Sequence, residues 1–133
     1  MASNSSGPYL FVAEAVLPHL HESEVRQVFG LLADRFPGAL LALDTAGPGF
    51  FDTQEQHDAL SKVEARMQWY CPDPAHLAEW RPGTEVVASH TLTSLPGPLL
   101  AELPVAYQEM VSALTAQRLP QAESYRLNLL RLP

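Results

Sequence analysis

Residues 11–20 have the sequence FVAEAVLPHL, and the interpretation of the whole chain starts from this stretch. Together with the residues just before it, it forms an apolar run over 9–17 that only Glu14 interrupts. A near-continuous apolar run is typical of a parallel strand buried on both faces. We therefore expect a buried strand over 9–17, with Glu14 at its carboxyl end.

A helix and a second strand are expected next. Apolar residues recur at helical spacing from Val25 to Phe36, and Pro37-Gly38 stops the helix. Residues 39–43 are again apolar and end at Asp44. Two buried strands joined by a helix form a βαβ unit, in which the strands are parallel.

The rest of the chain alternates between further elements. Residues 1–8 are small and polar, which predicts a disordered tail. The elements expected after the βαβ unit are a helix capped by Asp52 with the apolar stripe Leu60, Val63, Met67 and Tyr70, a short helix over 75–80, a strand over 85–93, a helix over 99–117 that Pro104 splits, and a closing strand over 124–132. This order predicts an α/β fold with a sheet of about four strands, parallel at its start, antiparallel at its end and flanked by helices.

Composition excludes several classes of partner. The 133 residues carry a net charge of −7 with only eight Lys and Arg, so binding to nucleic acid or to an anionic membrane surface is not expected. The single cysteine, Cys71, cannot form an internal disulfide, which suits a reducing cytoplasm. The N-terminus has no secretory pattern, and no apolar run reaches the length of a membrane helix.

Four stretches in order resemble one protein family. Residues 10–20 resemble the signature (I/V)AEG(V/L)LMYL, with Glu14 on the family's Glu, Ala15 in place of its Gly and Pro18-His19 in place of Met-Tyr. Residues 24–38 are similar to the family's helix and turn, residues 67–80 to its F-x-W…DP…L…W stretch, and residues 125–132 to its last strand. The family is that of the class I methyltransferases that comprises the leucine carboxyl methyltransferases and the bacterial O-methyltransferases of polyketide biosynthesis.

This resemblance implies a Rossmann-like sheet that uses S-adenosylmethionine (SAM). It aligns Phe11 with the fourth of seven strands, whereas the family's Gly-rich SAM turn and its ribose-binding acid belong to the first two. Only eight residues precede Tyr9, and Gly47-Pro48-Gly49, which has the G-x-G spacing, is expected to be a loop with Pro at its centre rather than a SAM turn. The expectation is therefore a partial methyltransferase domain over 9–133, from a truncated or split gene, that lacks the SAM-binding half and is not a competent O-methyltransferase alone.

The candidate site residues follow from the same resemblance. Glu14 and Ala15 would line the cleft for cofactor and small-molecule substrate, although Glu14 could instead cap a helix or pair with an Arg. His19 is the candidate catalytic base for an oxygen nucleophile, with packing at the cleft wall as the alternative. His19 and His21 could also form a metal pair, but no third ligand is in register, so no metal site is expected.

The remaining candidate side chains have ordinary structural interpretations. Trp69, Tyr70 and Trp80 could contact an aromatic substrate, although core packing is favoured. His57 and Asp58 are expected on a solvated helix face. Cys71 has no nearby His or Lys that would make it a nucleophile.

Two further functions stay open, and both involve the apolar strand over 9–17. In a half-sheet this strand becomes an edge, which favours a homodimer or pairing with a complementary N-terminal methyltransferase chain. A non-catalytic interaction protein that reuses the half-fold is therefore the second hypothesis. The third is a small enzyme that uses Glu14 and His19 in a new pocket.

Overall fold

The computed structural model describes residues 9–47, 67–118 and 124–133. The expected tail over 1–8 and the helix that starts at Asp52, with His57 and Asp58, lie outside the described residues up to position 66. The described elements are β1 (Leu10–Ala13), η1 (Leu17–His19), α1 (Glu22–Arg35), β2 (Leu40–Ala46), η4 (Pro74–His76), α3 (Leu77–Trp80), β3 (Glu85–Thr91), η5 (Leu92–Ser94), α4 (Gly97–Glu102), α5 (Val105–Gln117) and β4 (Tyr125–Arg131), where η denotes a 3-10 helix.

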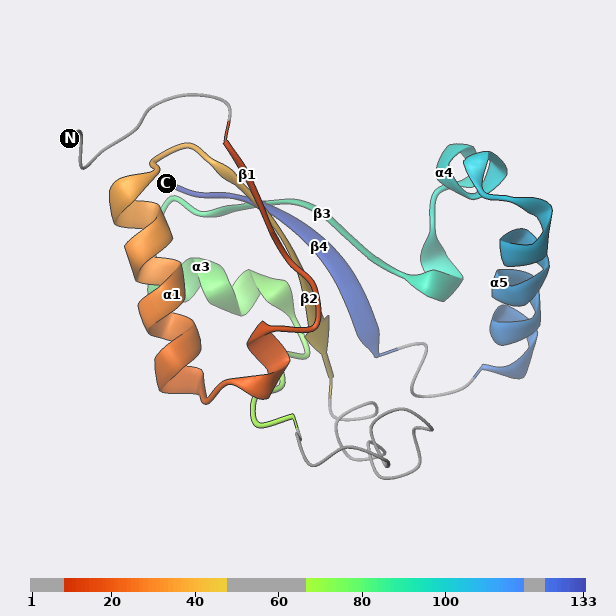
Figure 1. The fold of residues 1–133 in the computed structure, drawn as a ribbon, viewed down its shortest axis with the longest axis horizontal. Coiled ribbons are helices and arrows are strands. Elements are labelled where there is room, and N and C mark those ends of the chain that lie inside the picture. Colours follow the sequence, from red (N-terminus) through yellow and green to blue (C-terminus); the bar gives the residue numbers. More distant parts are fainter. Residues whose placement is uncertain (1–8, 48–66, 119–123) are drawn as a thin grey trace.

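The strands form one mixed sheet in the order β1-β2-β4-β3 (Figure 1). β1 is parallel to β2, while β4 is antiparallel to both β2 and β3. The expected four-stranded α/β sheet with a parallel start and an antiparallel end is confirmed. β1 lies at one edge of the sheet, as the half-sheet interpretation requires.

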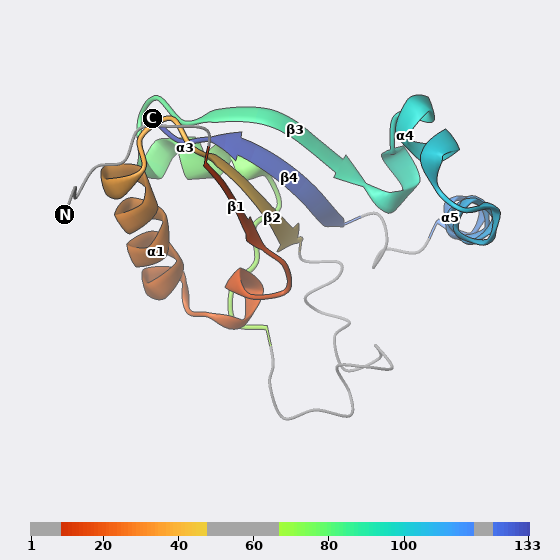
Figure 2. The ribbon, with the colours of Figure 1, turned by 45° about the horizontal axis from the view of Figure 1, so that its top comes forward.

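The first strand is shorter and more exposed than its sequence suggests. β1 spans only Leu10–Ala13, and Leu10 and Val12 are exposed, so the prediction of a strand over 9–17 buried on both faces is wrong. Two causes are visible. The backbone turns at Ala15, which has φ +56°, and the 3-10 helix η1 then starts at Leu17, with Pro18 in its first turn. No described helix covers the face of the sheet opposite α1 and α3 (Figure 2).

The second strand is longer than expected, because its polar residues have partners inside the sheet. β2 continues past Asp44 to Ala46 and pairs with β4 along its whole length, from Leu40 opposite Arg131 to Ala46 opposite Tyr125. The hydroxyl of Thr45 accepts a hydrogen bond of 3.0 Å from the side chain of Asn128 on β4. A buried polar residue need not end a strand when such partners exist.

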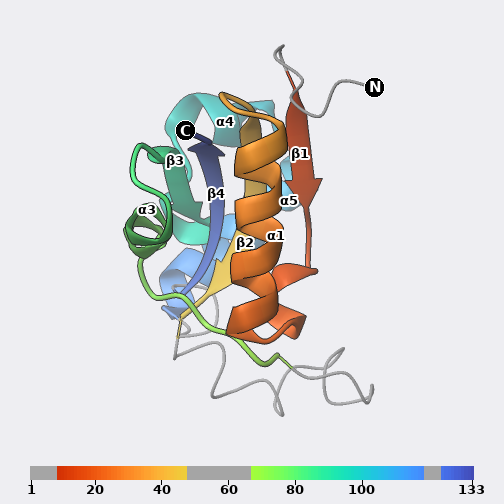
Figure 3. The same cartoon turned by 90° about the vertical axis from the view of Figure 1, so that its left-hand side faces the viewer.

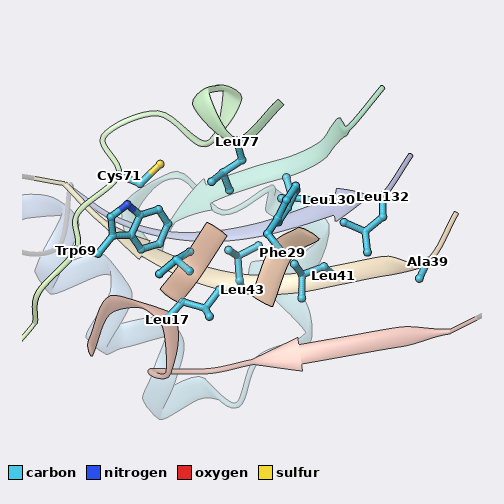
Figure 4. Close-up of a cluster of buried hydrophobic side chains, with 11 residues drawn as sticks. Leu17, Phe29, Ala39, Leu41, Leu43, Trp69, Cys71, Leu77, Leu130 and Leu132 are labelled. Atoms are coloured by element: carbon cyan, nitrogen blue, oxygen red, sulfur yellow. The ribbon is translucent and has the colours of Figure 1, made fainter. Parts of the chain in front are cut away.

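The hydrophobic core lies between the sheet and the pair α1 and α3, which cover the same face (Figures 2 and 3). Phe29 from α1 and Leu77 from α3 pack against Leu41 and Leu43 of β2 and against Leu130 of β4 (Figure 4). This explains the helical spacing found in the sequence: Val25, Phe29 and Ala33 form the buried stripe of α1.

Residues 67–70 contribute to the core without forming a helix. Met67 and Trp69 are buried, whereas Tyr70 is exposed, and none of them lies in a helix. The prediction that Met67 and Tyr70 share a helical stripe is therefore wrong. The backbone N–H groups of Gln68 and Trp69 donate to the carbonyl oxygen of Pro18, at 2.8 and 3.2 Å, and thereby attach this segment to η1.

The predicted C-terminal helix is split at Pro104, as expected, into α4 and α5. Both lie at the far end of β3, away from α1 and α3 (Figure 1). Val111 is buried, while Val105, Tyr107 and Met110 are exposed. Among the described residues, no helix combines the length and apolar character needed to cross a membrane.

Candidate functional site

A hollow of about 420 Å³ opens at the carboxyl end of β1 and beside the central residues of β2. The carboxyl ends of parallel strands are where ligands bind in open α/β sheets. Residues from β1, β2 and β4 and the residue that follows β1 line it: Val12, Ala13, Glu14, Ala42, Leu43, Asp44, Tyr125, Leu127 and Asn128. The structure thus places Glu14 at the strand-end position that the sequence predicted.

Asp44 is the most enclosed charged group of this hollow. Its residue surface is only 2% exposed, and its Oδ2 atom accepts two hydrogen bonds. One comes from the backbone N–H of Ala15, at 2.8 Å, and the other from the hydroxyl of Tyr125. Its other oxygen, Oδ1, is buried and has no partner within the described parts of the chain.

Tyr125 is held in its protonated form by this arrangement. Burial raises the pKa of the Tyr125 phenol, and the hydrogen bond to Asp44 and the charges of Asp44 and Glu14 raise it further. The phenol is therefore a neutral donor over the physiological range. The charge of Glu14 acts on this hydroxyl, so Glu14, Asp44 and Tyr125 form one electrostatic group.

The backbone of Ala15, just after β1, is hydrogen-bonded to a side chain of β2. Its φ of +56° is in the left-handed region, which favours glycine. Glycine is also the residue at this position in the signature that residues 10–20 resemble. The hydrogen bond from the Ala15 N–H to Asp44 holds this turn against β2. The amide of Ala15 is thus already engaged and does not point to a ligand.

His19 does not line this hollow. It lies on η1, half-buried, and its carbonyl oxygen accepts a hydrogen bond of 3.1 Å from the side chain of Gln68. Its Nδ1 atom is buried without a hydrogen-bond partner in the described segments. The cofactor roles of Glu14 and Ala15 and the catalytic role of His19 stay predictions.

Two of the aromatic candidates belong to the core. Trp69 is buried, and its ring lies 5.9 Å from that of Trp80, which packs edge-on against Phe29 at 6.2 Å. The guanidinium of Arg26 lies 4.5 Å from the centre of the Trp80 ring. Core packing of Trp69 and Trp80 is therefore confirmed, whereas Tyr70 is exposed.

Cys71 is a buried thiol of low reactivity. Burial raises its pKa from 9.0 to about 11. Its Sγ atom donates to the carbonyl oxygen of Asp73 at 3.2 Å. Within the described residues, no three His, Cys, Asp or Glu side chains are grouped so that they could hold a metal ion.

The sequence interpretation missed Asp44, Tyr125 and Asn128 as site residues. Asn128 is buried; its amide donates to the carbonyl of Leu43 at 3.2 Å, and its oxygen accepts from Ser89 at 2.7 Å. One signal was present, since Asp44 follows the second apolar strand just as Glu14 follows the first. Nothing local marked Tyr125, which lies 81 residues from Asp44.

Comparisons with known proteins show the fold. The sequence matches no protein-family model and no curated protein. A DUF574 family protein from Streptomyces avermitilis is similar in structure with a TM-score of 0.55 and 14% identity, over 96% of this chain and 45% of that chain. PKMT2 from Rickettsia typhi gives a TM-score of 0.42 at 10% identity, over 91% of this chain and 34% of that chain. The chain thus spans less than half the length of either structure, and the likeness to the Streptomyces protein supports the α/β fold alone.

The described residues fit SAM only in part. The carboxylate of Glu14 is exposed at the strand end and can accept hydrogen bonds from a ligand. The Ala15 amide, in contrast, is bonded to Asp44 and cannot donate to a cofactor in this arrangement. The described residues offer carboxylates but no glycine-rich turn of free amides, which is the usual source of affinity for such cofactors.

Proposed function

We propose that the chain is the acceptor-side half of a SAM-dependent O-methyltransferase, which transfers a methyl group to an oxygen of a small molecule or carboxylate. The observation that carries this proposal is one hollow lined by Glu14, which follows β1, and by Asp44, which lies within the adjacent parallel strand β2. The signature over residues 10–20 and the strand order support it.

The chain's own residues would position and deprotonate the acceptor. Glu14 would orient the substrate at the mouth of the hollow through its exposed carboxylate. His19 is the proposed base for the oxygen nucleophile; because it lies on η1 outside the hollow, the acceptor would have to extend from the hollow to η1. SAM would supply a methyl group activated by a sulfonium. The chain would act with a complementary N-terminal methyltransferase chain or as a homodimer, in a reducing cytoplasm.

Calorimetric titration of SAM into the folded chain tests this proposal. Because the amide turn that binds SAM is not among the described residues, we expect no micromolar binding by this chain alone. We expect SAM binding and methyl transfer after addition of the N-terminal half of a methyltransferase of the resembled family. Micromolar binding by the chain alone would contradict the half-enzyme interpretation, and no activity with the added half would contradict the methyltransferase itself.

A non-catalytic interaction module is the second candidate, and one observation favours it. β1 is an edge strand, and the apolar residues Leu10, Val12, Val87 and Leu127 are exposed. An unpaired edge strand and exposed apolar groups on the sheet both favour association with another chain. Association that persists without any SAM binding in the mixture above would support this module over the enzyme.

A further inference from the structure

The carboxylate of Asp44 uses only half of its hydrogen-bonding capacity. Both donors that reach it, the Ala15 N–H and the Tyr125 hydroxyl, converge on Oδ2. Oδ1 is buried and receives no hydrogen bond from any described residue, in a residue that is 2% exposed. A buried carboxylate oxygen without a donor is costly, so a donor that enters the hollow beside Asp44 gains a strong bond.

The charges of the residues that line the hollow favour a positively charged donor. Glu14 and Asp44 carry two negative charges, and none of the described residues that line the hollow is Lys, Arg or His. The phenol of Tyr125 stays neutral because its pKa is raised. Two carboxylates without a cation favour a positively charged ligand, and Oδ1 requires one that bears an N–H or O–H group.

The remaining walls are apolar. Val12 and Leu127 line the hollow and are 68% and 45% exposed. A volume of about 420 Å³ lies within the range of small-molecule sites, which combine apolar walls with a few polar groups. The hollow thus offers a hydrocarbon surface beside a buried acceptor.

We propose that this hollow binds a small molecule through a protonated amine. The ammonium group donates to Oδ1 of Asp44 with the charge of Glu14 nearby, and the hydrocarbon part lies against Val12 and Leu127. This inference goes beyond the proposed methyl transfer, because it requires neither SAM nor a partner chain. A negative result for SAM leaves it intact, and its own failure leaves the methyltransferase proposal standing.

Titration of the full chain with n-hexylammonium chloride tests this site, with n-hexanol as the neutral probe of the same shape. Amide nitrogen–proton correlation spectra follow binding. We expect n-hexylammonium to shift the resonances of the lining residues and to bind at least about tenfold more tightly than n-hexanol. Equal affinity for the two probes would overturn the proposal, since it would mean an apolar hollow only.

Matched charge variants locate the contact. Asp44→Asn keeps an oxygen for the Ala15 and Tyr125 donors but removes the charge and the free acceptor, so we expect n-hexylammonium affinity to fall at least about tenfold. Asp34→Asn makes the same change on α1, where Asp34 pairs with Arg81. It should leave the affinity unchanged. Equal affinities in the two variants would overturn the site.

If Asp44→Asn does not fold, a third variant still tests the site. Leu127→Lys introduces an ammonium at an exposed position of β4 on the wall of the hollow. This ammonium should compete for Asp44 and abolish n-hexylammonium binding while circular dichroism stays that of the parent chain. Undiminished binding in the folded Leu127→Lys variant would show that the amine does not enter this hollow.

Discussion

At the scale of single residues, Ala15 carries the clearest backbone strain. Its φ of +56° costs a non-glycine residue about 1–2 kcal/mol. Glycine avoids this strain, but it loses about 0.5–1 kcal/mol because its more flexible unfolded chain loses more entropy on folding. We therefore expect Ala15→Gly to raise the free energy of unfolding by up to about 1 kcal/mol, measured by urea titration. Glycine has the same entropy cost at Ala113, within α5, without strain to relieve.

Ala113→Gly is thus the control for this prediction, and it should lower the free energy of unfolding by about 1 kcal/mol. An equal loss of stability in Ala15→Gly and Ala113→Gly would contradict the prediction, because it would mean that the left-handed backbone of Ala15 carries no strain.

Cys71 makes stability depend on alkaline pH. Burial raises its pKa from 9.0 to about 11, so below 9.0 both the folded and the unfolded chain keep the proton. Between these values the unfolded chain loses it while the folded chain does not, and the free energy of unfolding must fall as pH rises. Urea titrations below pH 9.0 and near pH 11 measure this fall.

Comparison with Cys71→Ala separates the thiol from Tyr125, which also loses its proton at high pH only after unfolding. The variant should lose less stability than the parent chain over the same pH interval. Identical pH dependence of the two proteins would mean that the Cys71 thiol is not desolvated in the folded state.

At the scale of elements, α3 is attached to α1 by two contacts of unequal strength. Leu77 is 1% exposed within the core. Arg81, which follows α3, donates to the carbonyl oxygen of Gly30 at 3.2 Å and pairs with Asp34 at 2.8 Å. Gly30 permits this approach, because a Cβ at that position would lie 3.1 Å from the Nη2 atom of Arg81.

Burial outweighs the ion pair in this attachment. Leu77→Ala should lower the free energy of unfolding by about 2–5 kcal/mol through the cavity it leaves. Arg81→Ala should cost much less stability than Leu77→Ala, since its pair with Asp34 is exposed to solvent. Urea titration of both variants checks the order, and a larger loss for Arg81→Ala would show that the ion pair dominates.

The elements themselves were largely predictable, and the errors have local causes. Helical spacing predicted α1, and Pro104 predicted the division between α4 and α5. The strand boundaries failed where tertiary contacts decide them. β2 continues through Asp44, where two donors from distant parts of the chain bond to Oδ2 of its carboxylate. The chain leaves β1 early because Ala15 turns and donates to the same oxygen.

At the scale of the whole molecule, the open edge and the exposed apolar residues predict self-association. Val12 on β1 is 68% exposed, and a charge on an edge strand opposes pairing with another chain. We therefore expect the chain to associate as its concentration rises, and Val12→Lys to weaken that association. Sedimentation velocity over a concentration series measures both.

Val105 provides a matched control, because it is also 68% exposed but lies on α5. Val105→Lys should leave the association unchanged. If both lysines acted equally, the loss would reflect added charge rather than the edge of the sheet, and the proposed homodimer through β1 would be excluded.

Only part of the candidate site, the position of Glu14, was predictable from the sequence. Glu14 could be placed because an apolar strand ends at it, and the ends of parallel strands share one edge. The hydroxyl that completes the site comes from Tyr125, 81 residues from Asp44. Only the insertion of β4 between β2 and β3 brings it there, and no local pattern encodes that long-range pairing.

The position of β4 also affects how the protein can be made. β2 and β3 are not neighbours in the sheet; each pairs with β4, which follows both of them in the sequence. During synthesis on the ribosome, β3 therefore has no strand partner, and β2 has only β1, until residues 125–131 have been made. The synthesis of β4 is thus the step that joins the two parts of the sheet.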